Sequence, residues 1–67
     1  MFRRLGRRVR QLRLERGLTQ EGAATLAHLD AKHLQTIEAG KTNTTVASLV
    51  GLSRALGVTL MELFDGV

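Results

Sequence analysis

The sequence predicts an all-α fold, a compact five-helix bundle formed by residues 1–67 as a single domain. Apolar residues recur at steps of three and four, the spacing that places them on one face of a helix. Glycines and hydroxylated or acidic residues stand between these segments, where helices end and begin. Strand signals are missing, because no segment alternates Val, Ile or Tyr with polar residues and no Asn-Gly or Asp-Gly pair joins two such segments.

The first two helices are predicted from an apolar stripe and a cap. The stripe of the first helix consists of Phe2, Leu5, Val9 and Leu12, and Gly17 ends this helix. Thr19 is expected to cap a second helix over roughly 20–27, whose small residues permit another helix to approach closely. These small residues are Ala23, Ala24 and Ala27.

A third helix is expected over roughly 31–39, capped by Asp30 and ended by Gly40, with Leu34 and Ile37 packed inward. A fourth helix follows and ends at Gly57; caps for it are offered by Asn43, Thr44 and Thr45. Its expected inward residues are Val46, Leu49, Val50, Ser53 and Leu56. The capping-box spacing of Thr59 and Glu62 predicts a short last helix containing Leu60, Leu63 and Phe64.

Positive charge is concentrated at the start of the chain. The net charge is +4, yet the first 16 residues carry seven arginines and a single acid, Glu15. The arginines are Arg3, Arg4, Arg7, Arg8, Arg10, Arg13 and Arg16. This segregation indicates a polyanionic partner, either nucleic acid or an anionic membrane surface, while a solvated helix face is the alternative interpretation.

Composition argues against several classes of function. The chain has no Cys, and His28 and His33 do not share a helix face, so we expect no metal site and no cofactor. No Ser/His/acid set, carboxylate pair or glycine-rich phosphate loop is present, which argues against an enzyme. The apolar runs are too short to span a membrane and no secretory signal is recognised, so we expect a soluble cytoplasmic protein without membrane contact.

Two short capped helices joined by a turn of a few residues are typical of a helix-turn-helix, whose second helix enters the major groove of double-stranded DNA. On a helical wheel of residues 30–39, short or polar side chains gather opposite the apolar ones. Lys, Gln and Thr recognise base edges by hydrogen bonds or methyl contact. The expected base-contacting residues are Ala31, Lys32, His33, Gln35 and Thr36. Any surface helix has a polar outer face, so the prediction also depends on the arginine cluster.

Several motifs resemble those of one known family. They are Gly17-Leu18-Thr19-Gln20-Glu21, Leu34-x-x-Ile37-Glu38-x-Gly40-Lys41 and Ala55-Leu56-Gly57-Val58-Thr59-x-x-Glu62-Leu63-Phe64. Over nearly its whole length the chain is similar to the Cro/repressor-type (XRE) helix-turn-helix regulators, particularly the small phage repressors and restriction–modification controller proteins. The resemblance implies a lambda-repressor-like DNA-binding domain, sequence-specific transcription regulation, and a homodimer on a palindromic operator.

The resemblance also implies roles for single residues. The positions that relatives use to contact DNA phosphates are here Gln20, Lys41, Thr42 and Asn43. Where relatives have a turn glycine this chain has His28, and the positive φ expected there strains a histidine. Ala31 stands where relatives often carry a polar base-reading side chain, so base recognition is expected to depend on the residues after it or on an alanine methyl contact.

One arginine is expected to be structural. Leu5, Val9 and Arg13 lie on one i, i+4 row, so Arg13 continues the core-facing stripe of its helix. Leu34 and Glu38 lie on a similar row, and an unpaired charge at either margin would be costly. Relatives with the same Ile-Glu pair tend to have an arginine at this position. We therefore expect Arg13 to bond Glu38, while other arginines stay solvated or face DNA: Arg3, Arg4, Arg7 and Arg8.

The C-terminal segment holds more apolar residues than one short helix hides on its inner face. The expected dimer interface is Leu60, Met61, Leu63 and Phe64. Burial against the first helix, with Met61 merely exposed, is the alternative. Two other functions stay open beside DNA binding: an antitoxin-type or other protein-interaction module on the same fold, and a membrane-active cationic helix formed by the first 16 residues.

Overall fold

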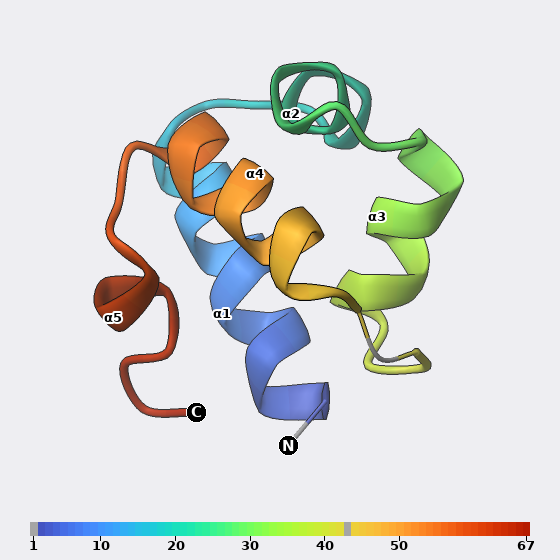
Figure 1. Ribbon diagram of the computed structural model, residues 1–67. Helices are drawn as coiled ribbons and strands as arrows, with labels where there is room; N and C mark the ends of the chain where they lie inside the picture. The colour runs from blue at the N-terminus through green and yellow to red at the C-terminus, as the bar shows by residue number, and fades with distance from the viewer. Residues whose placement is uncertain (1, 43) are drawn as a thin grey trace.

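The computed structural model describes residues 2–42 and 44–67. Its helices are α1 (Phe2–Glu15), α2 (Gln20–Ala27), α3 (Ala31–Glu38), α4 (Val46–Leu56) and α5 (Leu60–Leu63) (Figure 1). No strand occurs within the described ranges. The predicted all-α bundle of five helices is therefore confirmed. The cap proposed at Asn43 lies outside the described residues.

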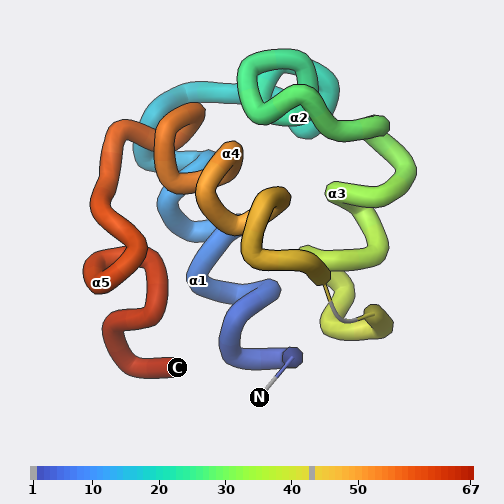
Figure 2. The backbone as a smooth tube through the Cα atoms, viewed as in Figure 1, coloured from blue at the N-terminus to red at the C-terminus, as the bar shows by residue number. Residues whose placement is uncertain are grey.

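Helix α1 is the centre of the arrangement. Figure 2 shows α3 on one side of it and α5 on the other, with α4 packed across it and α2 beyond α4. The start of α1 and the C-terminal residues lie at the same end of a molecule whose principal extents are 24 × 21 × 21 Å. No described helix has the length and apolar character needed to cross a membrane.

An aliphatic core fills the space between the helices. The side chains with almost no exposure are Val9, Leu34, Ile37, Leu52, Leu56 and Leu63. Two predictions for α4 are wrong: Val46 is 72% exposed, and the fully buried Leu52 was missed. Val46 stands at the first position of α4, at the edge of the core, whereas Leu52 and Leu56 belong to the buried core cluster. Phe2, expected in the buried stripe of α1, is also partly exposed.

Two glycines let helices pack with their backbones nearly touching. A Cβ atom on Gly6 would collide with the carbonyl oxygen of Ile37 and lie 2.6 Å from that of Glu38, so α1 and α3 meet closely there. A Cβ on Gly51 would lie 2.6 Å from the carbonyl oxygen of Ala27, where α2 crosses α4. The buried alanines of α2 contribute to the same close approach, as the sequence predicts.

Hydroxyl caps begin three of the helices. Thr19 Oγ1 accepts a hydrogen bond from Gly22 N at 2.9 Å, and Thr45 Oγ1 accepts one from Ser48 N at 3.1 Å. Thr59 and Glu62 form the predicted capping box at the start of α5. Asp30 is the N-cap residue of α3, as expected, but its side chain makes no capping hydrogen bond. Its ψ of 137° differs from the 160–164° of the threonine caps, and its carboxylate stays exposed.

Candidate nucleic-acid interface

The turn between α2 and α3 is short and well bonded. His28 ends α2 with φ 58°, which confirms the positive φ expected there. Leu29 N donates to Ala24 O at 2.8 Å, and the Leu29 side chain packs partly against the core. The chain therefore reverses within three residues, His28 to Asp30, and starts α3 at a defined angle to α2.

Helix α3 is held firmly from its inner side. Leu34 and Ile37 are 0% and 1% exposed, and Gly6 brings α1 against the last turn of α3. Because the inner face is completely packed, the side chains on the opposite face are presented from a fixed backbone. Such support is what a helix needs if it is to place side chains precisely in a groove.

An ion pair joins α1 to α3. Arg13 Nε donates to Glu38 Oε2 at 2.7 Å and Arg13 Nη2 to Glu38 Oε1 at 3.1 Å, a two-point contact. The two side chains are only 10% and 4% exposed. Arg13 Nη1 also donates to Leu18 O at 2.8 Å, and Gln20 Nε2 donates to Glu38 Oε1 at 3.2 Å. The pair thus also fixes the first residue of α2.

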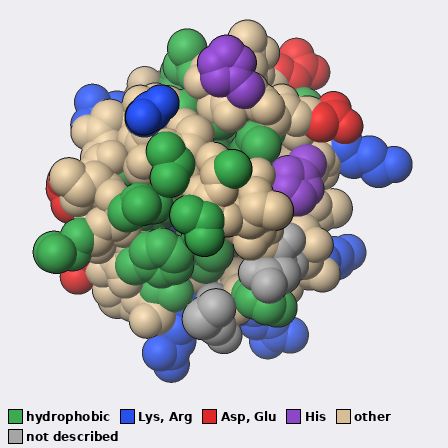
Figure 3. Space-filling view, viewed as in Figure 1, with side chains coloured by type: hydrophobic (Ala, Val, Ile, Leu, Met, Phe, Trp, Pro, Cys, Tyr) green, Lys and Arg blue, Asp and Glu red, His purple; other side chains and the backbone are tan. Residues whose placement is uncertain are grey.

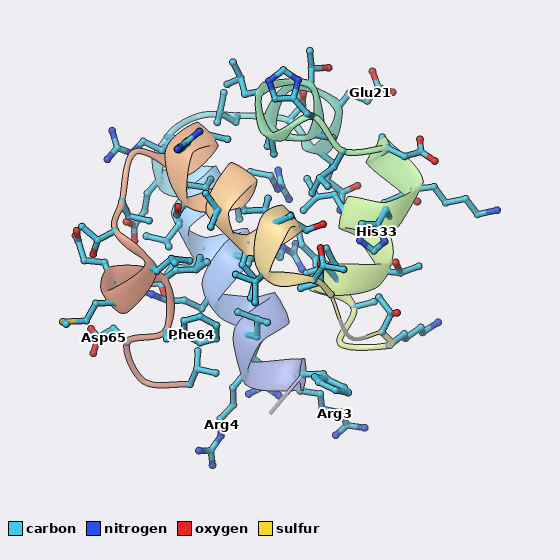
Figure 4. The ribbon with its side chains drawn as sticks, in the orientation of Figure 1. Arg3, Arg4, Glu21, His33, Phe64 and Asp65 are labelled. Atoms are coloured by element: carbon cyan, nitrogen blue, oxygen red, sulfur yellow. The ribbon has the colours of Figure 1, made fainter. Side chains whose placement is uncertain are left out.

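The outward face of α3 presents the residues expected to contact bases. Lys32 and Gln35 are exposed, while Ala31, His33 and Thr36 are half-buried. Thr36 Oγ1 donates to His33 O at 2.8 Å, so its hydroxyl is partly engaged with its own helix. His33 lies beside the loop that leads to α4, with Nε2 3.5 Å from Thr44 Oγ1 (Figure 4). Lys32 and Gln35 therefore project furthest, and the base contacts themselves stay predictions.

The described residues expected to contact phosphates lie around the C-terminal end of α3. Gln20 is half-buried and tied to Glu38, Lys41 is exposed, and Thr42 is half-buried. Lys41 N donates to Thr36 O at 3.1 Å, which positions the turn after α3. Asn43, the fourth residue of this group, lies outside the described residues.

Sequence reasoning missed one cation at this face. Arg10 lines a polar cleft of about 410 Å³ between α1, α2 and α3. The other lining residues are Arg13, Gln20, Gln35, Glu38 and Ala39. Arg10 lies three residues before Arg13 on α1, a spacing that makes the two side chains neighbours on the helix surface, so the placement of Arg13 beside α3 could have indicated Arg10 as well. Its exposed guanidinium adds positive charge between two expected DNA-contacting residues, Gln20 and Gln35.

Arg8 lies on the opposite side of α1 from this face. Its Nε and Nη2 donate to Glu62 O at 3.1 and 2.8 Å, so Arg8 binds the backbone of α5. The interpretation of Arg8 as a freely solvated arginine is therefore wrong, because its guanidinium is bound to α5. The sequence did not reveal this contact because a backbone carbonyl, unlike a carboxylate, leaves no mark in the pattern of charged residues.

An exposed apolar patch covers part of the molecule. Figure 3 shows hydrophobic side chains gathered over α4 and α5 on the face viewed. Met61 is 85% exposed, and Leu60 and Phe64 are each 38% exposed. Leu63 is 0% exposed, so its assignment to a dimer interface is wrong: as the inward residue of α5 it belongs to the core of its own chain.

The chain is similar to known proteins along nearly its whole length. Residues 4–63 match a family described as the helix-turn-helix domain. The HTH-type transcriptional regulator DdrOP3 of Deinococcus deserti is 36% identical over 64 residues, which cover 96% of this chain but only half of that protein. The restriction-modification controller protein C.AhdI from Aeromonas hydrophila has a TM-score of 0.92 and 35% identity, with 94% of this chain and 96% of that chain covered. The controller protein C.Esp1396I, solved as a tetramer with its natural 35 base-pair operator, has a TM-score of 0.86 and 30% identity, with 96% and 84% covered.

Proposed function

The chain belongs to the helix-turn-helix family, and we propose that it binds double-stranded DNA sequence-specifically and regulates transcription. The observation that carries this proposal is α3 itself: a helix packed completely on its inner face, with Lys32 and Gln35 exposed on its outer face. A helix of this kind, entered through a short turn, fits the major groove.

Base recognition and backbone contact fall to different residues. Lys32 donates to guanine and Gln35 pairs with adenine, while Thr36 offers its methyl group to thymine. Gln20 and Lys41, with Thr42, Asn43 and Arg10, contact phosphates on either side of the groove and set the position of α3. The protein acts through occupancy of DNA in the cytoplasm, without catalysis and without a cofactor.

A homodimer on a palindromic operator completes the proposal. The patch of Leu60, Met61 and Phe64 is the candidate interface, because it offers apolar surface that the chain itself leaves exposed. A two-fold pair would place the two α3 helices ~34 Å apart, matched to half-sites ~10 base pairs apart. The likeness to C.AhdI and C.Esp1396I favours a controller-type regulator of this kind.

Selection of bound sequences from a random pool of duplexes tests this function. We expect a palindromic motif, and Lys32→Ala should lose ~1–3 kcal/mol at particular base pairs. Lys41→Ala is the matched comparison: it should weaken binding to all sequences alike and lower the salt slope by ~1. Recovery of no enriched motif by the wild-type protein would contradict sequence-specific binding, and an equal loss on every sequence for Lys32→Ala would contradict its role in base recognition.

A further inference from the structure

A second positive surface lies on α1, outside the helix-turn-helix. Arg4, Arg7, Arg8 and Gln11 line a cleft of about 370 Å³ together with Asp65 and Gly66. Three arginines face one carboxylate here, so the cleft keeps a net positive charge. Arg4 and Arg7 are exposed, and neither forms an ion pair or hydrogen bond with any part of the chain that the structure describes.

The Arg8 side chain, which lines this cleft, is held in place by hydrogen bonds. Its two hydrogen bonds to Glu62 O and a third, at 3.4 Å, to Gln11 Oε1 hold the guanidinium against α5. Arg4 points away from the body of the molecule near the start of α1, and Asp65 lies across from it on the C-terminal segment (Figure 4). One hydrogen-bonded arginine and two exposed ones therefore surround a single opening.

The cleft and α3 lie on opposite sides of α1. Gly6 faces the carbonyl groups of α3 and Arg8 faces that of Glu62, and two residues of a helix turn its surface by about 200°. Figure 1 shows the same arrangement, with α3 and α5 flanking α1. DNA stays straight over such a distance, because its persistence length is ~50 nm and the molecule is 21–24 Å across. Around the axis of α1, Arg4 is turned by about 200° from Gly6 and Arg7 by about 100°. We therefore expect a straight duplex bound to α3 to leave Arg4 and Arg7 uncovered.

We propose that Arg4 and Arg7, beside Arg8, form a second and sequence-independent site for the phosphate backbone of another DNA segment. This inference rests on the proposed function, since the first segment is the operator held by α3. Guanidinium groups pair with phosphate oxygens through two parallel hydrogen bonds, and phosphate contacts carry no sequence information. The protein then holds two stretches of duplex at once, one chosen by sequence and one by charge.

The lining of the cleft favours nucleic acid over a membrane. A helix that binds an anionic bilayer inserts apolar side chains beside its cations. Here Leu5, Val9 and Leu12 of α1 are buried in the core. The exposed apolar residues of α1, Phe2 and Leu14, do not line the cleft, which is formed by arginines, Gln11, Asp65 and Gly66. A second duplex segment needs only the exposed charges that Arg4 and Arg7 present.

Capture of a second duplex tests the proposal. Operator duplex on beads is loaded with labelled protein, and a fluorescent duplex of unrelated sequence is added at increasing salt. Wild-type protein should retain the second duplex, and the double variant Arg4→Gln, Arg7→Gln should lower the salt slope of its capture by about 2, one for each lost phosphate contact. Operator affinity should stay the same. Arg54→Gln is the matched control, because Arg54 is an exposed arginine of α4 away from the cleft.

The label on the protein distinguishes failure of the proposed function, operator binding, from failure of the second DNA site on α1. Beads that retain no protein would overturn the proposed function and this inference with it, whereas beads that retain protein without the second duplex would overturn only the second site. An equal loss of capture for the double variant and Arg54→Gln would also overturn it, as would a lower salt slope for operator binding itself. Binding of phosphatidylserine vesicles in place of duplex would assign the cleft to a membrane and overturn the inference.

Discussion

Helices α3 and α5 flank α1 from opposite sides, and each is bound by one arginine of α1. Arg13 reaches the carboxylate of Glu38 on α3, where both side chains are almost completely buried. Arg8 reaches the backbone carbonyl of Glu62 on α5, at the surface. We therefore expect the two arginines to contribute unequally to stability, because their contacts differ in burial and in the charge of the acceptor while the donor residue is the same.

The two helices also differ in what else holds them. Helix α3 places Leu34 and Ile37 in the core and touches the α1 backbone at Gly6. Helix α5 spans only Leu60–Leu63 and places Leu63 alone in the core. The stability of α5 therefore depends more on its capping box and on the hydrogen bonds from Arg8. We expect α5 to unfold locally before α3 does.

Among the variants considered, removal of Arg13 should cause the largest loss in the free energy of unfolding. Arg13→Ala leaves the Glu38 carboxylate buried without its charged partner, which costs ~3–5 kcal/mol. For a domain of this size each kcal/mol lowers the melting temperature by roughly 4–8 °C, so thermal unfolding followed by circular dichroism measures the change. Arg7→Ala is the control on the same helix and should stay within ~0.5 kcal/mol. Equal, small shifts for both variants would show that Arg13 is only another surface charge.

Gly6→Ala tests the backbone contact on the α3 side. The added methyl group would meet the carbonyl oxygens of Ile37 and Glu38, so α1 and α3 must move apart at a cost of ~1–3 kcal/mol. Urea denaturation measures the loss. Arg10→Ala, an exposed position one turn along α1, should change the free energy of unfolding little. A Gly6→Ala variant as stable as the wild type would mean that the two helices are not held in close contact.

Arg8→Ala tests the α5 side and should cost about 1 kcal/mol, because its two hydrogen bonds lie at the surface. The loss should be local: hydrogen exchange of the amides of α5 should quicken while the amides of α3 keep their protection. Arg8→Lys should restore only part of that protection, since a lysine does not donate through a planar fork. Faster exchange in α3 as well would contradict the separation of the two sides.

The smallest loss of stability is expected when the capping box of α5 is weakened by protonation of Glu62. Thr59 N donates to Glu62 Oε1 at 3.1 Å, and this backbone hydrogen bond, with that of the Thr59 side chain, holds the pKa of Glu62 below 4.5. Since the folded pKa is the lower one, this stabilisation is fully present above pH 4.5 and is lost as the pH falls through the depressed pKa. Unfolding measured from neutral pH into the acid range should show a small loss that Glu62→Gln lacks. If wild type and Glu62→Gln lost stability identically with falling pH, the contribution of the Glu62 carboxylate to stability would be contradicted.

Much of the fold follows from short-range patterns. The cap by Thr19 and the capping box of Thr59 and Glu62 are predicted correctly, because each depends on atoms a few residues apart. The positive φ of His28 is predicted by the family resemblance instead, since relatives have a glycine at this position. Arg13 and Glu38 were predicted as partners for a related reason: each continues an apolar helical row, so both had to lie at the edge of the core.

The sequence by itself determined where the helices begin and end and which face of α3 is polar, since hydrogen bonds along one helix and a period of 3.6 residues decide both. Only the tertiary structure decided that Leu52 rather than Val46 is buried, that Leu63 is a core residue, and that Arg8 binds α5 across 54 positions of sequence. These depend on how separate helices pack, and the closest packing is set by backbone atoms meeting at Gly6 and Gly51. Every residue has a backbone carbonyl group, so the sequence does not indicate which carbonyl accepts a hydrogen bond from a distant side chain. Such hydrogen bonds are seen only in the folded structure.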